Sequence, residues 1–92
     1  MNISIEYCPK CGWLLRAAWL AQELLTTFSD EITALTLIPS PTAGLFQIRA
    51  NDTVLFDRKT YGGFAEPKIL KQMVRDLIAP AKDLGHSDVH EK

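Results

Sequence analysis

The stretch "YCPKCGW", residues 7 to 13, places two cysteines three positions apart with a proline and a lysine between them. This C-x-x-C spacing serves two unrelated chemistries, because it is half of a tetrahedral zinc site and also a dithiol that opens and closes as a disulfide. Cys8 and Cys11 are the only cysteines in the chain, which excludes the framework of several disulfides found in small secreted domains. The flanking segments must decide between the two chemistries.

Apolar residues on both sides of the dithiol follow regular patterns. A period of two predicts strands, and apolar positions three and four apart predict helices. The expected elements are a strand at 2–6, a helix from 11 to about 28, a strand at 32–38, a hairpin of two strands within 45–57, and a helix that starts at 67 and ends before Pro80. The expected order is therefore β-α-β-β-β-α.

This order predicts an α/β protein with the minimal thioredoxin-like layout. The first strand-helix-strand crossover makes a parallel pair and the hairpin adds antiparallel strands. We expect a two-layer sandwich in which a mixed four-stranded sheet carries both helices on one face, formed by one domain at residues 1–84 with a polar tail at 85–92. The side chains expected on the open, wet face of the sheet are Ser4, Glu6, Thr36, Gln47 and Arg49.

Composition and charge exclude several classes of partner. The chain is 47% hydrophobic and 23% charged with a net charge of -1, so it lacks the basic surface expected of a nucleic-acid-binding or membrane-surface protein. The start "MNISIEY" has neither the basic nor the apolar region of a signal peptide, and no apolar run reaches the length of a membrane span. We therefore expect a cytoplasmic protein with no nucleic-acid or membrane partner.

A zinc site needs more ligands than one C-x-x-C supplies. Structural zinc takes four ligands, and the other candidates are His86 and His90 in the polar tail. A zinc ion shared by two chains, each lending one cysteine pair, is a second form of this hypothesis. If the dithiol is redox-active and does not bind zinc, no metal or other cofactor is expected.

The position of the dithiol favours redox chemistry. A C-x-x-C at the end of the first strand puts one sulfur in a loop and the other in the first turn of the following helix, where free N–H groups and the helix dipole stabilise a thiolate. Pro9 stiffens the loop, and Lys10 adds a cation that also favours the thiolate. Trp13 follows closely and is expected at the rim of the dithiol or partly buried against the sheet.

Two long segments carry a resemblance to a known family. They are "IEYCPKCGWLLRAAWLAQEL" and "PSPTAGLFQIRANDTVLFDRKTYGGFAEPKILKQMVRD", and together they resemble the selenoprotein W/T/H family of thioredoxin-like proteins, also called the Rdx family, in its bacterial, cysteine-containing form. The similarity runs from Ile3 to about Ala81. Its specific parts are the C-x-x-C after the first strand, Gly44 ahead of "FQI", and a glycine-containing loop that ends in Phe64.

The resemblance implies an oxidoreductase-like protein without a well-established substrate, and together with the dithiol it leads us to expect a thiol-disulfide oxidoreductase that acts on protein thiols or glutathione. It implies Cys8 and Cys11 as catalytic residues, and the residues expected to support them are Pro9, Lys10, Trp13, Gly44 and Phe64. In the selenium-containing relatives the selenium stands at the position of Cys11. By the logic of thioredoxin, however, we expect Cys8 to be the more exposed sulfur and the nucleophile.

One departure from thioredoxin keeps other functions open. Thioredoxin holds a cis-proline opposite its dithiol that orients substrate and keeps metal out, whereas Gly44 precedes the corresponding strand here. The alternatives are therefore a non-catalytic protein-binding module with a regulatory dithiol and a zinc-binding C-x-x-C domain.

Overall fold

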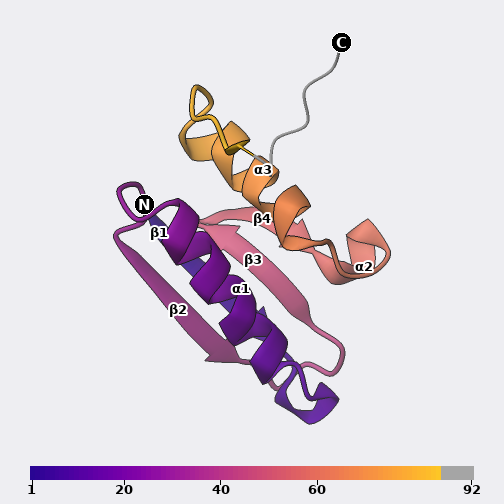
Figure 1. Cartoon of the computed structure of the whole chain (residues 1–92). Helices are drawn as coiled ribbons and strands as arrows, with labels where there is room; N and C mark the ends of the chain where they lie inside the picture. The colour runs from indigo at the N-terminus through magenta and orange to yellow at the C-terminus, as the bar shows by residue number, and fades with distance from the viewer. Residues whose placement is uncertain (86–92) are drawn as a thin grey trace.

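A computed structural model describes residues 1–85 as one layer of strands covered by one layer of helices (Figure 1). The elements are β1 (Asn2–Tyr7), the 3-10 turn η1 (Pro9–Cys11), α1 (Leu14–Thr27), β2 (Ala34–Pro39), β3 (Phe46–Ala50), β4 (Thr53–Asp57), α2 (Arg58–Tyr61) and α3 (Pro67–Ile78). The predicted order is confirmed, with one addition. The loop expected after the hairpin begins with the single helical turn α2.

The sheet has the order β2-β1-β3-β4, with β1 in the interior. β1 runs parallel to β2 and antiparallel to β3, and β3 runs antiparallel to β4, as the crossover and the hairpin predict. The hairpin turns at Asn51, whose φ of 52° lies in the left-handed region that asparagine tolerates. The end of β1, which leads into the dithiol, therefore lies at the same end of the sheet as the start of β3 and the end of β4.

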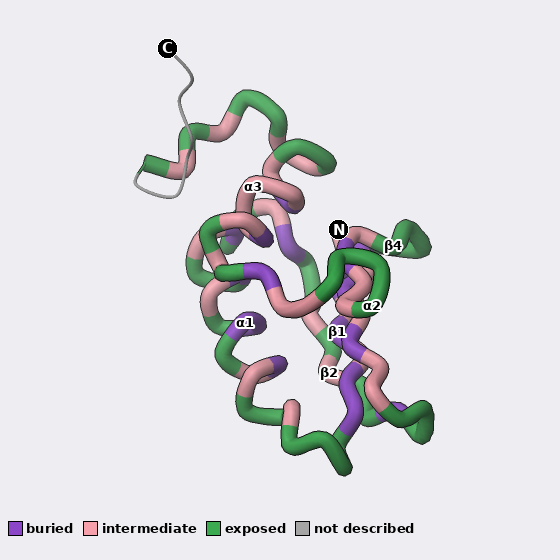
Figure 2. The backbone as a smooth tube through the Cα atoms, turned by 90° about the vertical axis from the view of Figure 1, so that its right-hand side faces the viewer, coloured by how far each residue is buried: buried purple, intermediate pink, exposed green. Residues whose placement is uncertain are grey.

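The core lies between the sheet and the helices α1 and α3 (Figure 2). β1 and β3 alternate as predicted, with their apolar side chains fully buried against the helices and their polar side chains only partly covered. The residues of this core are Ile3, Ile5, Tyr7, Ala17, Leu20, Ala21, Leu24, Phe28, Ile32, Phe46, Ile48, Ala50, Phe56, Ala65, Leu70 and Val74. Both long helices cover one face, so the predicted two-layer fold is confirmed.

Helix α1 begins later than the sequence pattern predicts. The apolar spacing predicts a helix from Cys11, but the structure places a separate 3-10 turn at Pro9–Cys11 and starts α1 at Leu14. Gly12 causes the interruption, because its φ of 77° lies in the left-handed region and cannot continue a right-handed helix. Cys11 is therefore outside α1.

Candidate functional site

The two cysteines lie where β1 ends. Cys8 directly follows β1, and η1 then turns the chain so that Cys11 returns towards it. The Cα atoms of Cys8 and Cys11 are 5.4 Å apart and their sulfurs lie at disulfide distance, within the range that a disulfide requires. Pro9 occupies the first position of the turn, as expected of a residue that fixes φ and lacks an N–H group.

The two cysteine residues differ sharply in solvent exposure. Cys8 is 2% exposed, whereas Cys11 and the neighbouring Lys10 belong to the exposed residues. The expectation that Cys8 is the more accessible sulfur is therefore wrong. Its physical reason is that Cys8 continues the interior strand of the sheet, while Cys11 sits on a turn that projects from it.

The expectation that Cys11 lies in the first turn of the long helix, where the helix would stabilise its thiolate, is also wrong. Cys11 ends η1, and Gly12 and Trp13 separate it from the first residue of α1. The N–H of Gly12 donates to the Pro9 carbonyl at 3.0 Å, so the turn closes on itself. The positive end of the α1 dipole therefore starts beyond the dithiol.

An aromatic cluster supports the dithiol end of the sheet. Trp13 is half-buried and meets Phe46 and Phe64 edge to face, with ring centroids 6.2 and 5.0 Å apart. Phe46 and Phe64 also meet each other at 5.1 Å. Because Phe46 pairs with Tyr7 in the sheet, this cluster lies directly beside the end of β1. Trp13 is thus partly buried against Phe46 of the sheet, which is the second of its two expected positions.

Two arginines lie over this cluster. The guanidinium carbon of Arg16 is 4.1 Å from the centroid of Phe64, and that of Arg58 is 4.9 Å from Trp13 and 5.9 Å from Phe64. These separations are within the range of cation-π attraction. Sequence reasoning missed both arginines, because they come from α1 and α2, and no local pattern predicts that the two segments meet.

Gly44 is the predicted site residue that binds Arg58. It turns the chain into β3 with a φ of 75°, and its carbonyl accepts hydrogen bonds from Nε and Nη2 of Arg58 at 3.4 and 3.3 Å. A Cβ built at Gly44 would lie 3.6 Å from Nη2 of Arg58, which is ordinary van der Waals contact, so the positive φ and not a lack of room favours glycine here. Gly44 therefore helps to place a cation at the dithiol end.

The turn α2 that carries Arg58 is capped by Asp57. The Asp57 carboxylate accepts hydrogen bonds from the backbone N–H and the hydroxyl of Thr60 at 3.0 and 2.9 Å, and from the Gln47 amide at 3.2 Å. The backbone bond from Thr60 is the main reason that the pKa of Asp57 lies below its usual value, and the other bonds and the charge of Lys59 act in the same direction. The cap fixes where α2 begins.

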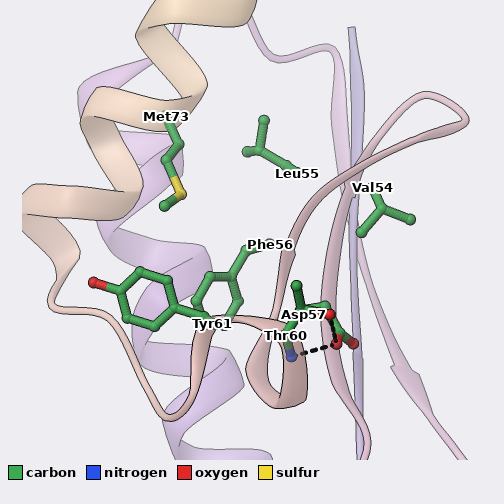
Figure 3. A pocket seen from close by; sticks show the side chains of 7 residues that line it. All are labelled: Val54, Leu55, Phe56, Asp57, Thr60, Tyr61 and Met73. Atoms are coloured by element: carbon green, nitrogen blue, oxygen red, sulfur yellow. Dashed lines mark hydrogen bonds between the residues drawn. The ribbon is translucent and has the colours of Figure 1, made fainter.

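A pocket of about 360 Å³ lies beside the edge strand β4 and is lined by residues of β4, α2 and α3 (Figure 3). Neither cysteine lines this pocket. Its lining residues are Val54, Leu55, Phe56, Asp57, Thr60, Tyr61 and Met73. Figure 3 shows Met73 of α3 and Tyr61 of α2 facing the side chains of β4, with the Asp57–Thr60 hydrogen bond at the lower rim. Two polar residues of the pocket, Asp57 and Thr60, therefore belong to the cap of α2, and Tyr61 adds a hydroxyl group.

The metal hypothesis gains no further ligands within residues 1–85. In this part of the chain no three His, Cys, Asp or Glu side chains are grouped so that they could hold a metal ion. His86 and His90, the remaining candidates, lie outside the described residues, as does nearly all of the predicted tail.

Among residues 1–85, no helix is long and apolar enough to cross a membrane.

Comparison with known proteins places this geometry in a family. A crystal structure of a protein from Bordetella parapertussis is 52% identical, with a TM-score of 0.80 over 84% of this chain and 96% of that one. The crystal structure of a selenoprotein W-related protein from Vibrio cholerae is 54% identical, with a TM-score of 0.79 over 83% of this chain and 94% of that one. No protein in the curated set matches. The Rdx family model matches residues 2–76, and the chain, with its paired cysteines after the first strand, belongs to the Rdx family.

Proposed function

We propose that the protein is a thiol-disulfide oxidoreductase in which Cys11 attacks the substrate and Cys8 resolves the mixed disulfide. The observation that carries the proposal is the unequal exposure of two cysteine residues whose sulfurs lie at disulfide distance. Disulfide exchange requires a sulfur that a partner can reach and a second sulfur held close behind it. Cys11 meets the first requirement and Cys8 the second.

The reaction balances with the two cysteines alone. The Cys11 thiolate attacks one sulfur of a substrate disulfide, a mixed disulfide forms, and the other substrate sulfur leaves as a thiolate that takes up a proton. Cys8, after losing its proton, then attacks the sulfur of Cys11 and releases the second substrate thiol. The substrate gains two electrons, the pair Cys8–Cys11 is oxidised, and a thiol donor such as glutathione restores it.

Trapping with single-cysteine variants tests the assignment. Reduced Cys8→Ser and Cys11→Ser proteins are mixed with a substrate disulfide and analysed by intact mass, with the double variant as control. We expect Cys8→Ser to accumulate a mixed disulfide on Cys11, because the resolving sulfur is missing, and Cys11→Ser to react slowly. A trapped adduct on Cys8 alone would reverse the two roles.

A redox titration tests whether the dithiol is active at all. Zinc-free protein is equilibrated in glutathione buffers and the fraction of intramolecular disulfide is measured by mass. We expect a reversible two-electron transition within the range of known C-x-x-C proteins, which spans about 150 mV. If no such transition occurs, or if zinc can be removed only by unfolding, the oxidoreductase proposal fails.

A protein-binding module is the second candidate function, and exposed apolar residues favour it. Leu15 is 80% exposed and Trp19 is 46% exposed on the outer side of α1, one turn apart. Such residues are typical of contact surfaces when they cluster. Turnover separates the two candidates, because an enzyme reduces many equivalents of a small disulfide in the presence of a thiol donor, whereas a binding module does not.

A further inference from the structure

We propose that Arg16 and Arg58, held over the rings of Trp13 and Phe64, bind carboxylate groups beside the target disulfide, so that the preferred substrate is a protein or peptide segment with acidic residues flanking its cysteine. This inference rests on the proposed function, since it names the substrate class of the same site. Four observations lead to it: the placement of the guanidinium groups, their lack of carboxylate partners among the described residues, their position at the dithiol end of the sheet, and the aromatic rings beneath them.

The two arginines converge on one pair of rings from different parts of the chain. Arg16 belongs to the first turn of α1, and Arg58 is the first residue of α2. Both guanidinium groups lie within 6 Å of the Phe64 centroid, at 4.1 and 5.9 Å. Two positive charges that lie near the same ring raise the local positive potential, and an anion bound beside them lowers the electrostatic energy. The arrangement therefore favours a negatively charged ligand.

Neither guanidinium has a carboxylate partner among residues 1–85. The ion pairs of the described residues involve Lys71, Arg75 and Lys82, and neither Arg16 nor Arg58 takes part in one. Arg58 uses Nε and Nη2 on the Gly44 carbonyl. A guanidinium has five N–H donors in a planar fork that matches a carboxylate, so donors remain for a ligand on both arginines.

The nearest carboxylate in sequence is already engaged. Asp57 precedes Arg58, but its oxygens accept hydrogen bonds from Thr60 and Gln47, and Lys59 contributes the nearby positive charge that acts on it. Asp57 therefore stabilises the turn that carries Arg58 rather than neutralising Arg58.

The cations lie within reach of a substrate that is bonded to Cys11. Trp13, beneath Arg58, follows Cys11 by two residues, and Gly44, which binds Arg58, leads into the strand that pairs with β1. An extended substrate advances about 3.3 Å per residue, so side chains one to three positions from its cysteine lie about 3 to 10 Å from the reacting sulfur. Lys10, exposed between the two cysteines, adds a third positive charge to this end of the sheet.

The aromatic support makes the guanidinium groups better receptors than mobile surface arginines. Both arginines are half-buried, and stacking on rings fixes their planes before a ligand arrives. A preorganised donor loses less conformational entropy on binding, and a bidentate charge-assisted hydrogen bond is stronger than a neutral one. The net charge of the whole chain is -1, so the attraction arises from this local group and not from a general positive charge.

The test uses three synthetic peptides of identical length, each with one cysteine activated as a mixed disulfide with 2-thiopyridine. The flanking residues are Glu and Asp in the first peptide, Gln and Asn in the second, and Lys in the third. The second-order rate constant of the reduced protein is measured from released thiopyridine. We expect the acidic peptide to react about 10-fold faster than the amide peptide, which corresponds to about 1.4 kcal/mol, and the lysine peptide to react most slowly. The acidic preference should shrink in 1 M salt, where the screening length is about 3 Å.

Substitutions of the two arginines test whether these residues cause the preference for the acidic peptide. In Arg16→Gln and Arg58→Gln we expect the ratio of acidic to amide rates to fall about 3-fold each, and in the double variant to approach one. Arg16→Lys and Arg58→Lys retain the charge but lose the planar fork, so they should restore part of the ratio. Lys71→Gln is the matched control, since it removes one positive charge that is paired with Glu23 away from the dithiol, and its ratio should equal that of the unmodified protein.

Glutathione activated as the same mixed disulfide with 2-thiopyridine distinguishes the two sources of such carboxylates, because its leaving group is then identical to that of the peptides. If it reacts 10-fold faster than the acidic peptide and this advantage disappears in Arg58→Gln, the arginines select the small thiol, and the protein segment is wrong as the preferred substrate. Equal rates for acidic and amide peptides would overturn the inference and leave the oxidoreductase proposal intact.

A binding measurement covers the remaining case, in which no disulfide reacts. The acidic peptide with Ser in place of Cys is titrated into the protein, and the indole N–H of Trp13 is followed by NMR, with the amide peptide as control. Shifts with the acidic peptide alone would support the carboxylate receptor although the oxidoreductase proposal had failed. Absence of shifts with both peptides, together with absence of exchange, would overturn both.

Discussion

Positively charged side chains have different partners at the dithiol end of the sheet and in the helical layer. In the helical layer, Lys71 of α3 is 2.8 Å from the Glu23 carboxylate of α1, and Lys82, beyond α3, is 3.3 Å from that of Glu31. At the dithiol end, Arg16 and Arg58 lie over aromatic rings, and Arg58 donates to a carbonyl. The first arrangement is internally neutral, whereas the second keeps its positive charge.

The difference separates charges that join elements of the fold from charges that remain for a ligand. An ion pair between α1 and α3 satisfies both partners within the protein, so nothing further is expected to bind there. A guanidinium on a ring is oriented but not neutralised, because the ring contributes a quadrupole and no net charge. Positively charged side chains thus join elements of the fold in one region, and in the other they are the residues that we propose bind the substrate. The following changes test this distinction, from the largest expected effect to the smallest.

Removing the ring at the base of the aromatic cluster should have the largest effect. Phe46 is 1% exposed and meets Trp13, Phe56 and Phe64 edge to face. We expect Phe46→Ala to lower the free energy of unfolding by about 3–5 kcal/mol, measured by urea denaturation, because a large buried cavity is created. Phe46→Leu should lose less, and it keeps the measurement possible if the alanine variant does not fold.

The matched control for this change is Val54→Ala. Val54 lies on the exposed side of β4, at 45% exposure. Exposed substitutions usually change stability by about 0.5 kcal/mol or less. A loss at Phe46 no larger than at Val54 would show that the aromatic cluster is not the support of the dithiol end, and the comparison would lose its structural basis.

Removing the cap of α2 should have an intermediate effect. Asp57→Ala deletes the carboxylate that accepts from Thr60, and we expect the free energy of unfolding to fall by about 1 kcal/mol. Because the turn holds Arg58, the acidic-to-amide rate ratio should fall as well. Asp30→Ala, at an exposed position with no such bond among the described contacts, is the control and should change neither quantity.

The stability that the Asp57 carboxylate contributes should decrease as the pH falls. Its pKa is lowered in the folded protein, chiefly by the backbone N–H of Thr60, so the folded state binds the proton less tightly than the unfolded state does. The stability contributed by the carboxylate is therefore present above the unfolded pKa of about 3.9 and is lost as pH falls through the folded value. The stability difference between unmodified protein and Asp57→Ala should narrow below about pH 4. A difference that widens there would contradict the sign.

Breaking an ion pair of the helical layer should have the smallest effect. Glu23 is 38% exposed in its side chain, so we expect Glu23→Gln to change the free energy of unfolding by about 0–1 kcal/mol, and less at high salt. The peptide rate ratio should not change. If Glu23→Gln altered that ratio as strongly as Arg58→Gln does, the two regions would not be separate, and the distinction drawn above would be wrong.

The fold could be predicted because each element carries its own local signal. Alternating residues such as Ile3 and Ile5 predict a strand, and the spacing of Ala17, Leu20 and Leu24 predicts the buried side of α1. The family resemblance added the same layout from longer stretches of sequence, and the structure and comparisons confirm it.

The details of the site could not be predicted in the same way. The exposure of Cys11 follows from the turn at Pro9–Cys11 and the left-handed Gly12, and the helical spacing of the apolar residues gave no sign of that break. The meeting of Arg16 and Arg58 depends on where β4 ends relative to α1, which is a property of the assembled sheet. Long-range placement of this kind leaves no local pattern for sequence reasoning to use.

The interior position of β1 has a consequence for synthesis. Asn2 pairs with Ala34, and Ile3 pairs with Ala50, whereas the β3–β4 hairpin closes through a short local turn. Pairing distant segments requires closing long loops before any contact is gained. On a chain that grows from its N-terminus, the strand that precedes the dithiol is made before both of the strands that flank it. We therefore expect Cys8, the more protected sulfur of the folded protein, to be as open to oxidants as Cys11 on the nascent chain until Ala50 has left the ribosome.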